Sequence, residues 1–379
     1  MIDAETLNTL PDELLARLKT RGFDPEQLRR WAARVGEGDE RNRLTGTVEL
    51  LPAAMLERLP QDGQERAAAR ARGERALAEG DVAICVLAGG MATRMGGVVK
   101  SLLAVHEEHT FLDLRLAERT AIAQKHGVAP PLWLMTSEPT TGPITQALAA
   151  RGLAADPDVA TFEQLVSLRL TPEGELFTDD DGEPSVYATG HGDLPEALRR
   201  SGLLTRFVER GGRYVWISNI DNLGARVDTA ILGQHIVDDR ALTVDVVDKV
   251  PGDKGGGPVL HDGAPIIAEH FRLPKGFNAE AVPVFNTNTF LVDAARLLEL
   301  TMDWTYVEVE KNVGDQPAVQ FERLLGEITV GIRPSFQHVS RETEGTAAAR
   351  SRFLPVKTHE DLEAAKPAIA TIAASLGLP

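Results

Sequence analysis

The sequence has little cysteine, little positive charge and no long apolar run. Its single cysteine, Cys85, cannot form an internal disulfide. The 40 lysine and arginine residues are outnumbered by 56 aspartate and glutamate residues, and the net charge of −16 argues against nucleic-acid or anionic-membrane partners. No apolar run reaches membrane-spanning length and no signal pattern opens the chain, so we expect a cytoplasmic protein with no membrane partner.

The rest of the composition is that of an ordinary globular protein. Hydrophobic residues make up 43% of the chain and charged residues 25%. A chain of 379 residues can bury a large core and form two or three domains. Because the protein as a whole is acidic, a phosphate-bearing substrate would need a locally basic pocket.

The pattern of apolar residues changes near residue 80. Before it, helical spacing predicts helices over residues 7–20, 24–35 and 64–78. The Arg/Ala-rich segment 66–75 could suggest an RNA-binding helix, but its neighbouring glutamates favour a solvated helix face. After residue 80, strands are predicted over 82–87, 132–136, 214–218, 242–247, 284–292 and 328–332. Helices are predicted between them, over 112–126, 144–150, 194–201, 229–237, 293–300 and 317–325.

This alternation predicts an α/β fold with a mixed, mainly parallel sheet flanked by helices on both faces. Ligands of such sheets bind outside the carboxyl ends of the strands. We expect an N-terminal helical region over 1–79, a catalytic domain over 80–340 and a short C-terminal segment with a helical tail over 341–379.

A glycine-rich loop follows the first strand of the alternating part, over residues 87–101. Gly89 and Gly90 let backbone N–H groups approach an anion closely, and Arg94 and Lys100 add positive charge. Neither a phosphate-binding G-x-x-x-x-G-K-S loop nor a dinucleotide-binding G-x-G-x-x-G turn fits the spacing. The loop therefore indicates a nucleoside triphosphate, although a glycine-rich turn with solvated basic residues is the alternative.

Polar residues follow or interrupt two further strands. Asn219 and Asp221 come after an apolar strand and would share one face of an extended chain, where a carboxylate can bind Mg²⁺ beside phosphate oxygens. Asn286 and Asn288 lie inside a buried strand, where unpartnered amides cost ~1–3 kcal/mol each. Sugar hydroxyls would partner them, as would backbone groups of a nearby loop. A simple turn would equally explain Asn219 and Asp221.

Three further residues stand where a ligand could be held. His191 lies between two glycines before a predicted helix and could donate to a phosphate or a ribose, although an ordinary loop histidine gives the same pattern. Lys254 precedes three glycines. Lys357 precedes a helix that Thr358 and Asp361 could cap. Surface lysines are common, so position alone singles out neither lysine.

Taken together, these segments resemble the eukaryotic-type UTP–glucose-1-phosphate uridylyltransferase family, which is related to the UDP-N-acetylhexosamine pyrophosphorylases. The resemblance covers roughly residues 80–365, and its motifs occur in the family's order. They are 87–101, Thr110-Phe111-Leu112-Asp113-Leu114, Leu134-Met135-Thr136-Ser137, Thr161-Phe162-Glu163-Gln164, 190–193, 201–204, 217–225, Asp248-Lys249, 254–257, 285–288 and 351–358.

The resemblance implies a Rossmann-like nucleotidyltransferase core and a Mg²⁺-dependent reaction that joins a nucleoside triphosphate to a sugar 1-phosphate and releases pyrophosphate. It implies nucleotide contacts from Leu87, Ala88, Gly89, Gly90, Met135, Gln164, Gly190 and His191. It implies substrate contacts from Asn219, Lys254, Gly256, Glu269, Asn286 and Asn288, and a metal contact from Asp221. Lys100, Lys357 and Arg94 would stabilise the charge of the reacting phosphates.

The glycine loop departs from the family's pattern. Ala92 stands at the usual third glycine, Val99 replaces the proline before the lysine, and the loop is one residue short. The nucleotide preference could therefore differ from UTP, which leaves guanylyl or adenylyl transfer to another sugar or cyclitol 1-phosphate, such as valienol 1-phosphate, as the alternative. An inactive nucleotide-sugar-binding protein is a third hypothesis.

The C-terminal end also differs from that of many relatives. They carry a long β-helix used for assembly after the motif around Lys357, whereas here residues 358–379 remain. We therefore expect a monomer or a small homo-oligomer.

Overall fold

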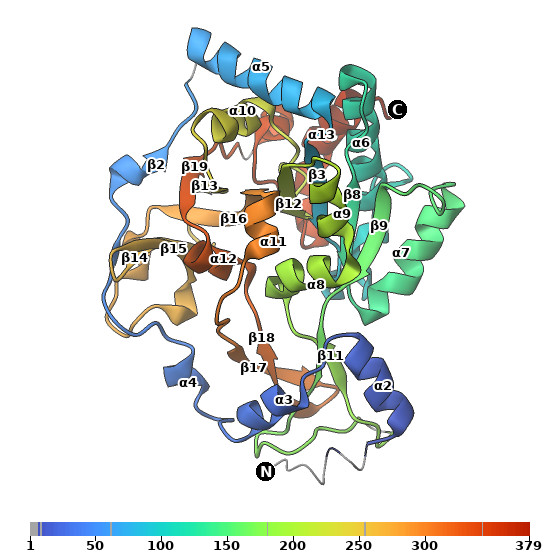
Figure 1. Cartoon of the computed structure of the whole chain (residues 1–379), viewed down its shortest axis with the longest axis vertical. Coiled ribbons are helices and arrows are strands. Elements are labelled where there is room, and N and C mark those ends of the chain that lie inside the picture. Colours follow the sequence, from blue (N-terminus) through green and yellow to red (C-terminus); the bar gives the residue numbers. More distant parts are fainter. Residues whose placement is uncertain (1–6, 8–9, 61–62, 180, 254, 343) are drawn as a thin grey trace.

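An eight-stranded sheet forms the centre of the computed structural model, which describes residues 7, 10–60, 63–179, 181–253, 255–342 and 344–379 (Figure 1). In spatial order its strands are β2 (Leu56–Glu57), β19 (Pro334–His338), β13 (Leu242–Asp248), β16 (Val284–Asp293), β12 (Tyr214–Asn219), β3 (Val82–Leu87), β8 (Leu132–Thr136) and β9 (Val159–Glu163). Neighbouring strands run parallel except that β16 is antiparallel to both β12 and β13. The predicted mixed, mainly parallel sheet is confirmed.

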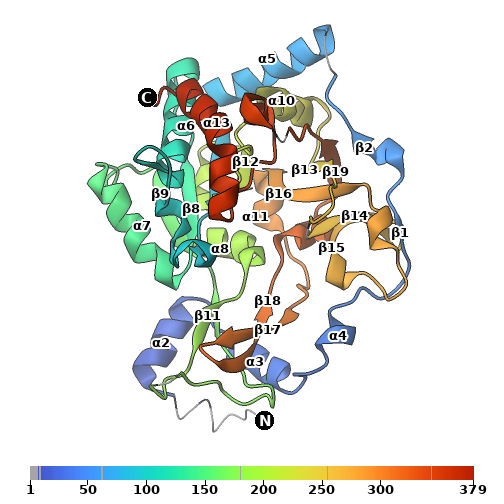
Figure 2. The ribbon, with the colours of Figure 1, turned by 180° about the vertical axis from the view of Figure 1, so that it is seen from behind.

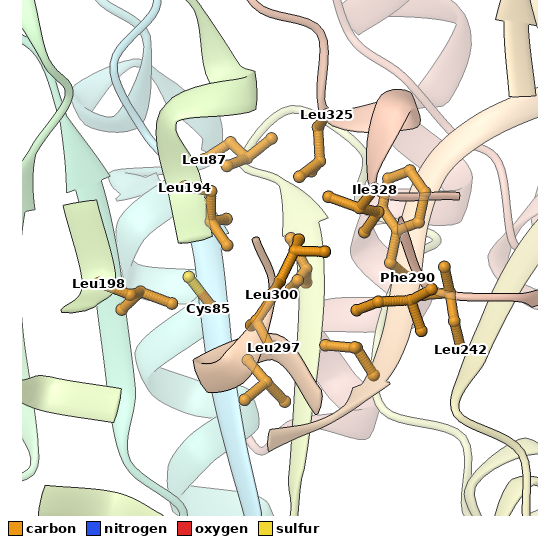
Figure 3. Packing of buried hydrophobic residues seen from close by; sticks show 14 of the residues in the cluster. Cys85, Leu87, Leu194, Leu198, Leu242, Phe290, Leu297, Leu300, Leu325 and Ile328 are labelled. Atoms are coloured by element: carbon orange, nitrogen blue, oxygen red, sulfur yellow. The ribbon is translucent and has the colours of Figure 1, made fainter. Parts of the chain in front are cut away.

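Helices cover both faces of this sheet because the side chains of its buried strands alternate between the faces. On β3, Ile84 and Val86 face a cluster that includes residues of α6 (Phe111–His126), α7 (Glu138–Ala150) and α13 (His359–Ser375). Cys85 and Leu87 face the opposite cluster (Figure 3). That cluster includes residues of α8 (Leu194–Ser201), α9 (Leu203–Glu209) and α11 (Ala294–Glu299). Burial raises the pKa of the Cys85 thiol, which is therefore a packing residue.

Two segments near the end of the alternating part were predicted wrongly. The helix expected over 317–325 is β18 (Gln316–Glu322), which pairs with β17 (Val307–Val313) in a hairpin. Residues 314–315 form the two-residue turn between these strands, and Gly314 has φ +59° there. A glycine with this backbone conformation is typical of a tight hairpin and not of a helix start. Most of the range 328–332, where a strand was expected, forms helix α12 (Ile328–Gly331). The strand of this region is β19, which begins at Pro334. A short apolar run does not distinguish a buried strand from a buried helix.

The first 80 residues contain the expected helices and also supply strands to the rest of the molecule. The predicted helices are α2 (Asp12–Thr20), which lies within the predicted range 7–20, α3 (Pro25–Ala32) and α5 (Gln64–Glu79). The short helix α4 (Gly38–Arg41) was not predicted. β1 (Val48–Leu50) pairs with β14 (Gly256–His261), which pairs with β15 (Ala264–Glu269), and β2 adds to the main sheet. Within the described ranges, no helix combines the length and the apolar composition needed to cross a bilayer.

Helix α5 lies against α10 (Thr229–Val237) at one end of the molecule (Figures 1 and 2). A Cβ added at Gly233 would stand 1.6 Å from the carbonyl oxygen of Ala69, and one at Gly73 would stand 2.0 Å from that of Thr229. These glycines allow the two helix backbones to touch. The Arg/Ala-rich helix therefore buries a face of small residues, and its charged side chains lie on the remaining surface.

Candidate functional site

A polar cavity of about 180 Å³ lies where β12 ends and β16 passes beside it. It is lined by residues from six separate parts of the chain. Eight of the predicted site residues line it: His191, Asn219, Asp221, Gly256, Glu269, Asn286, Asn288 and Lys357. The cavity lies at the carboxyl end of β12, where the α/β fold predicts a ligand site.

Two of the asparagines are presented by an irregularity in β16. Along β13, Asp245 faces Thr289 and the next residue, Val246, faces Asn286, so Thr287 and Asn288 have no opposite partner in this ladder. Asn288 adopts a left-handed backbone conformation with φ +57°, which asparagine tolerates better than most residues. Its side-chain Nδ2 donates to Asn219 Oδ1 at 2.9 Å, and its backbone N–H donates to Asn286 Oδ1 at 3.0 Å. The bulge thereby joins three amides at one wall of the cavity.

Asp221 pairs with Lys100 across the end of the sheet, with 2.8 Å between Nζ and Oδ2. Lys100 opens a short 3₁₀ turn after the glycine-rich loop, 121 residues earlier in the chain. The side chains are 18% and 10% exposed, so the pair is only partly open to water. Among the described residues no group of three or more His, Cys, Asp or Glu side chains could hold a metal ion. A divalent ion at this place would therefore rest on Asp221 together with phosphate oxygens of a substrate, as Mg²⁺ sites commonly do.

Lys357 reaches the same cavity from the C-terminal part of the chain. The backbone N–H of the preceding residue, Val356, donates to the carbonyl oxygen of Asp221 at 3.0 Å. Helix α13 then begins with a capping box between Thr358 and Asp361, as predicted. The Lys357 side chain is exposed, and its ammonium has no ion-pair partner within the described part of the chain.

His191 is fixed between two glycines that touch the backbone of Arg323. A Cβ at Gly190 or Gly192 would stand 2.5 or 2.7 Å from that backbone. The N–H of Leu325 donates to His191 Nδ1 at 2.8 Å, which assigns the ring proton to Nε2. Burial lowers the pKa of His191, so a neutral imidazole with one N–H to donate lines the cavity.

Glu269 and Gly256 line another wall of the cavity, on the hairpin β14–β15. The two residues face each other in the register of the hairpin, and a Cβ at Gly256 would stand 2.5 Å from the carbonyl oxygen of Ala268. Burial raises the pKa of Glu269. Lys254, which precedes this hairpin, lies outside the described residues.

Six of the eight predicted nucleotide-binding residues, Leu87, Ala88, Gly89, Gly90, Met135 and Gln164, form a second group at the carboxyl ends of β3, β8 and β9. Leu87 faces Met135, and the N–H of Ala88 donates to the Met135 carbonyl at 2.8 Å. A Cβ at Gly89 would stand 2.5 Å from Oε1 of Gln164, whereas one at Gly90 would meet open space. The N–H of Lys100 donates to the Gly90 carbonyl at 3.2 Å, which connects this group to the polar cavity through the Lys100–Asp221 pair.

Arg94 belongs to neither group. It is exposed in the 3₁₀ turn Thr93–Met95, and none of the residues lining the polar cavity belongs to this turn. Its guanidinium makes no ion pair with a described residue.

Two residues that hold segments of the site in place were not predicted from the sequence. The side-chain oxygen of Asn222 accepts from Leu354 N–H at 2.8 Å, and its Nδ2 donates to the Arg352 carbonyl at 3.2 Å, so it fastens the Lys357 segment to the Asp221 turn. Buried Arg115 donates to the carbonyls of Asn219 and Asn222 at 3.2 and 2.8 Å. A charged residue on the apolar face of a predicted helix was the available signal for Arg115.

Comparisons with known proteins agree on one family. A family model described as UTP–glucose-1-phosphate uridylyltransferase matches residues 54–374. The uridylyltransferase of that name from Encephalitozoon cuniculi is 30% identical over 293 residues, which cover 74% of this chain and 57% of the relative. The one from Musa acuminata is 32% identical over 292 residues, which cover 74% and 61%. The chain thus spans about three fifths of the length of these relatives.

Solved structures share the fold. A UDP-glucose phosphorylase from Trypanosoma brucei superimposes with a TM-score of 0.73 at 23% identity, covering 93% of this chain and 77% of that one. A putative UDP-N-acetylglucosamine pyrophosphorylase from Entamoeba histolytica gives a TM-score of 0.70 at 17% identity, with coverages of 83% and 84%.

Proposed function

This chain belongs to the UTP–glucose-1-phosphate uridylyltransferase family, and from that premise we propose that it transfers the uridylyl group of UTP to glucose 1-phosphate, giving UDP-glucose and pyrophosphate. One observation carries the proposal. Lys100, Asp221 and Lys357 lie far apart in the sequence, yet an ion pair joins Lys100 to Asp221, and Asp221 and Lys357 line one cavity. A backbone hydrogen bond from Val356 to Asp221 holds the Lys357 segment at this place.

In this reaction a phosphate oxygen of the sugar phosphate attacks the α-phosphorus of the nucleotide. The new oxygen–phosphorus bond forms as the bond from the α-phosphorus to the bridging oxygen breaks, and pyrophosphate leaves with that electron pair. The attacking oxygen is already anionic near neutral pH, so the protein needs no general base. Its task is to hold two polyanions together and to stabilise the charge that develops between them.

The cavity residues are suited to divide this task. Lys357 would contact the sugar phosphate and the α-phosphate, and Lys100 the triphosphate. The neutral imidazole of His191 would donate from Nε2 to a phosphate oxygen. Asn286, Asn288 and Glu269 would bind sugar hydroxyls, since their amide and carboxyl groups surround the same cavity.

Proteins of this class generally use a divalent metal, and we propose Mg²⁺ bound by Asp221. The residues present fit such an ion, because a single, mostly buried carboxylate suits a metal that is shared with substrate phosphates. The ion would neutralise phosphate charge and orient the leaving pyrophosphate. When no metal ion is bound, the ammonium of Lys100 balances the negative charge of Asp221 through their ion pair.

Contacts around the nucleotide-binding group support uracil as the base. A Cβ at Gly89 would stand 2.5 Å from Oε1 of Gln164, so the side-chain amide of Gln164 lies beside the glycine-rich loop. That amide can both donate to and accept from the edge of a base bound next to the loop.

Pyrophosphate release from matched substrate pairs tests this function. UTP, GTP, ATP, CTP and dTTP are each combined with a panel of hexose and cyclitol 1-phosphates in the presence of Mg²⁺. We expect the highest kcat/KM with UTP and glucose 1-phosphate. A higher value for another nucleotide or a cyclitol phosphate would overturn the substrate assignment, and no release from any pair would overturn the reaction itself.

A further inference from the structure

A second and larger hollow is separated from the polar cavity by the segments around Asn222 and Phe353. Residues of α5, α6 and α10, which lie together at one end of the molecule (Figures 1 and 2), line much of it. We name it the basic groove. Its volume is about 950 Å³, at the upper end of the range of small-ligand pockets. Eight lysine and arginine residues line it, against five aspartate and glutamate residues, in a protein whose net charge is −16.

Most of the acidic groups of the basic groove already have partners. Glu74 pairs with Lys125, Glu118 with Arg115 and Asp248 with His338, while Asp228 caps helix α10. Glu342 is the remaining carboxylate. The groove therefore offers little negative charge to balance further cations.

Several of its arginines have no carboxylate partner among the described residues. They are Arg58, Arg66, Arg70, Arg226 and Arg350. Arg66 and Arg70 stand four residues apart on α5, a spacing at which like charges repel each other. Arg226 is half-buried, and its Nε has no hydrogen-bond partner in the described structure. Burial is the main cause that lowers its pKa; nearby Arg352 and Arg115 act in the same direction, whereas Glu118 acts against them. An anion bound here would reduce the repulsion between Arg66 and Arg70, and it would stabilise the charge of half-buried Arg226.

We infer that the basic groove is a binding site for a compact anion carrying two or more phosphoryl groups, distinct from the substrate cavity. The planar arginine forks provide the bidentate donors that phosphate oxygens accept. The volume of about 950 Å³ suits a small molecule, and the acidity of the whole protein disfavours an extended nucleic acid.

The basic groove and the polar cavity share one dividing wall. Gly224, Ser351 and Arg352 line the groove, whereas Asn222, Phe353 and Lys357 line the cavity. A Cβ at Gly224 would stand 2.5 Å from the carbonyl oxygen of Ser351, so the two segments touch directly. An anion in the groove would thus lie against the segment that carries Lys357.

Calorimetric titration with inorganic tripolyphosphate tests the site. The titration uses the full chain with Lys100→Ala and Lys357→Ala already in place, so that phosphate binding in the substrate cavity is weakened beforehand. We expect one equivalent to bind this background, and Arg70→Ser with Arg350→Ser to weaken that binding at least tenfold. Both arginines are exposed and make no side-chain hydrogen bond to a described residue, so the fold is expected to survive.

The matched control replaces two arginines outside the groove, Arg30→Ser and Arg75→Ser, and changes the net charge by the same amount. This control should bind tripolyphosphate as its background does. Equal binding by the groove variant and the control, or no binding by the background, would overturn the inference. Should the double variant unfold in thermal denaturation, Arg350→Gln alone gives the same comparison. Neither negative result bears on the transferase proposal, which the substrate panel tests in the unaltered protein.

Discussion

Single residues of this protein owe their roles to the few atoms around them. Asp221 illustrates the point, because its side chain meets Lys100 while its carbonyl oxygen holds Val356 beside Lys357. One residue thus ties together the glycine-rich loop, the end of β12 and the C-terminal segment. Charge and position, rather than an ionisable nucleophile, are what this site provides.

Removing either lysine ammonium should slow turnover strongly. We expect Lys100→Ala and Lys357→Ala each to lower kcat by ~10²–10³, the loss typical of a preorganised electrostatic group. Steady-state pyrophosphate release measures the effect. Lys366→Ala is the control, since that lysine is exposed on α13 and pairs only with Glu363. Near-normal kcat in both site variants would contradict the assigned roles.

Buried His235 should make stability depend on pH. Burial, and next the nearby Arg240, lower its pKa to about 3, from 6.5 in an unfolded chain. Below pH 6.5 the unfolded state therefore binds a proton that the folded state excludes. Its contribution is complete above pH 6.5 and is lost as the pH falls toward 3, by at most about 1.4 kcal/mol per pH unit.

Urea unfolding of the wild type and His235→Leu between pH 4.5 and 7.5 measures this dependence. The variant loses the contact from Nδ1 to Thr243 Oγ1. Because leucine cannot bind a proton, the variant also loses the contribution of residue 235 to the pH dependence of stability. We expect the gap in unfolding free energy between the two proteins to narrow as the pH falls. A constant gap would show that the pKa of His235 is the same in the folded and unfolded states, which would contradict the lowered pKa.

At the scale of elements, close backbone contacts and helix caps determine how the pieces meet. Helices α5 and α10 touch through Gly73 and Gly233, and α13 starts at the Thr358–Asp361 capping box. The glycines and the capping box each involve only a few neighbouring residues, but they determine how elements that are distant in the sequence pack against each other.

Enlarging the glycine contact should separate α5 from α10. We expect Gly233→Ala to destabilise the protein by ~1–3 kcal/mol or more, because the added methyl would overlap a backbone carbonyl. Gly142→Ala on α7 is the matched control: apart from its chain neighbours it meets no atom within 4 Å, and the gain in helix propensity is offset by contact with the following Pro143, so its effect should stay within about 1 kcal/mol. Chemical denaturation measures both, and equal effects would contradict the proposed contact.

The cap of α13 should affect both stability and catalysis. Thr358→Ala removes the oxygen that accepts from Asp361 N–H at 3.1 Å, at a cost of ~1 kcal/mol. Because Lys357 is the preceding residue, we expect a lower kcat as well. Thr358→Ser keeps the oxygen and should restore unfolding free energy and kcat together. Failure of the serine variant to rescue either quantity would refute the role of the cap.

At the scale of the whole molecule, the fold holds itself together without a metal cluster in its described part. The core consists of apolar layers on the two faces of one sheet. Under the proposed function, a divalent ion would act in the reaction, and its effect on the fold can be measured separately.

Chelation should separate activity from stability. We expect EDTA to abolish pyrophosphate release while leaving the melting temperature in the absence of nucleotide unchanged within measurement error. Added Mg²⁺ should restore activity. Calorimetry and the activity assay test this together, and a large fall in melting temperature with EDTA would indicate a structural metal instead.

Much of this architecture was predictable because its signals are local. The buried runs Val82–Leu87 and Leu132–Thr136 fold as the strands expected, and the Thr358–Asp361 cap begins a helix as expected. The errors fell on β18 and α12, short segments whose apolar residues suit either conformation.

The sequence by itself determined the α/β sheet, the glycine-rich loop and the kinds of side chain available, since hydrophobic periodicity and backbone freedom act over a few residues. Only the tertiary structure decided that Lys100 meets Asp221 and that a bulge turns Asn288 toward Asn219. It also decided that arginines of α5 with no carboxylate partner in the described chain share a groove with Arg350. These contacts join residues far apart in the chain. No local preference fixes them, because they arise only when the layers of the sheet and its helices pack.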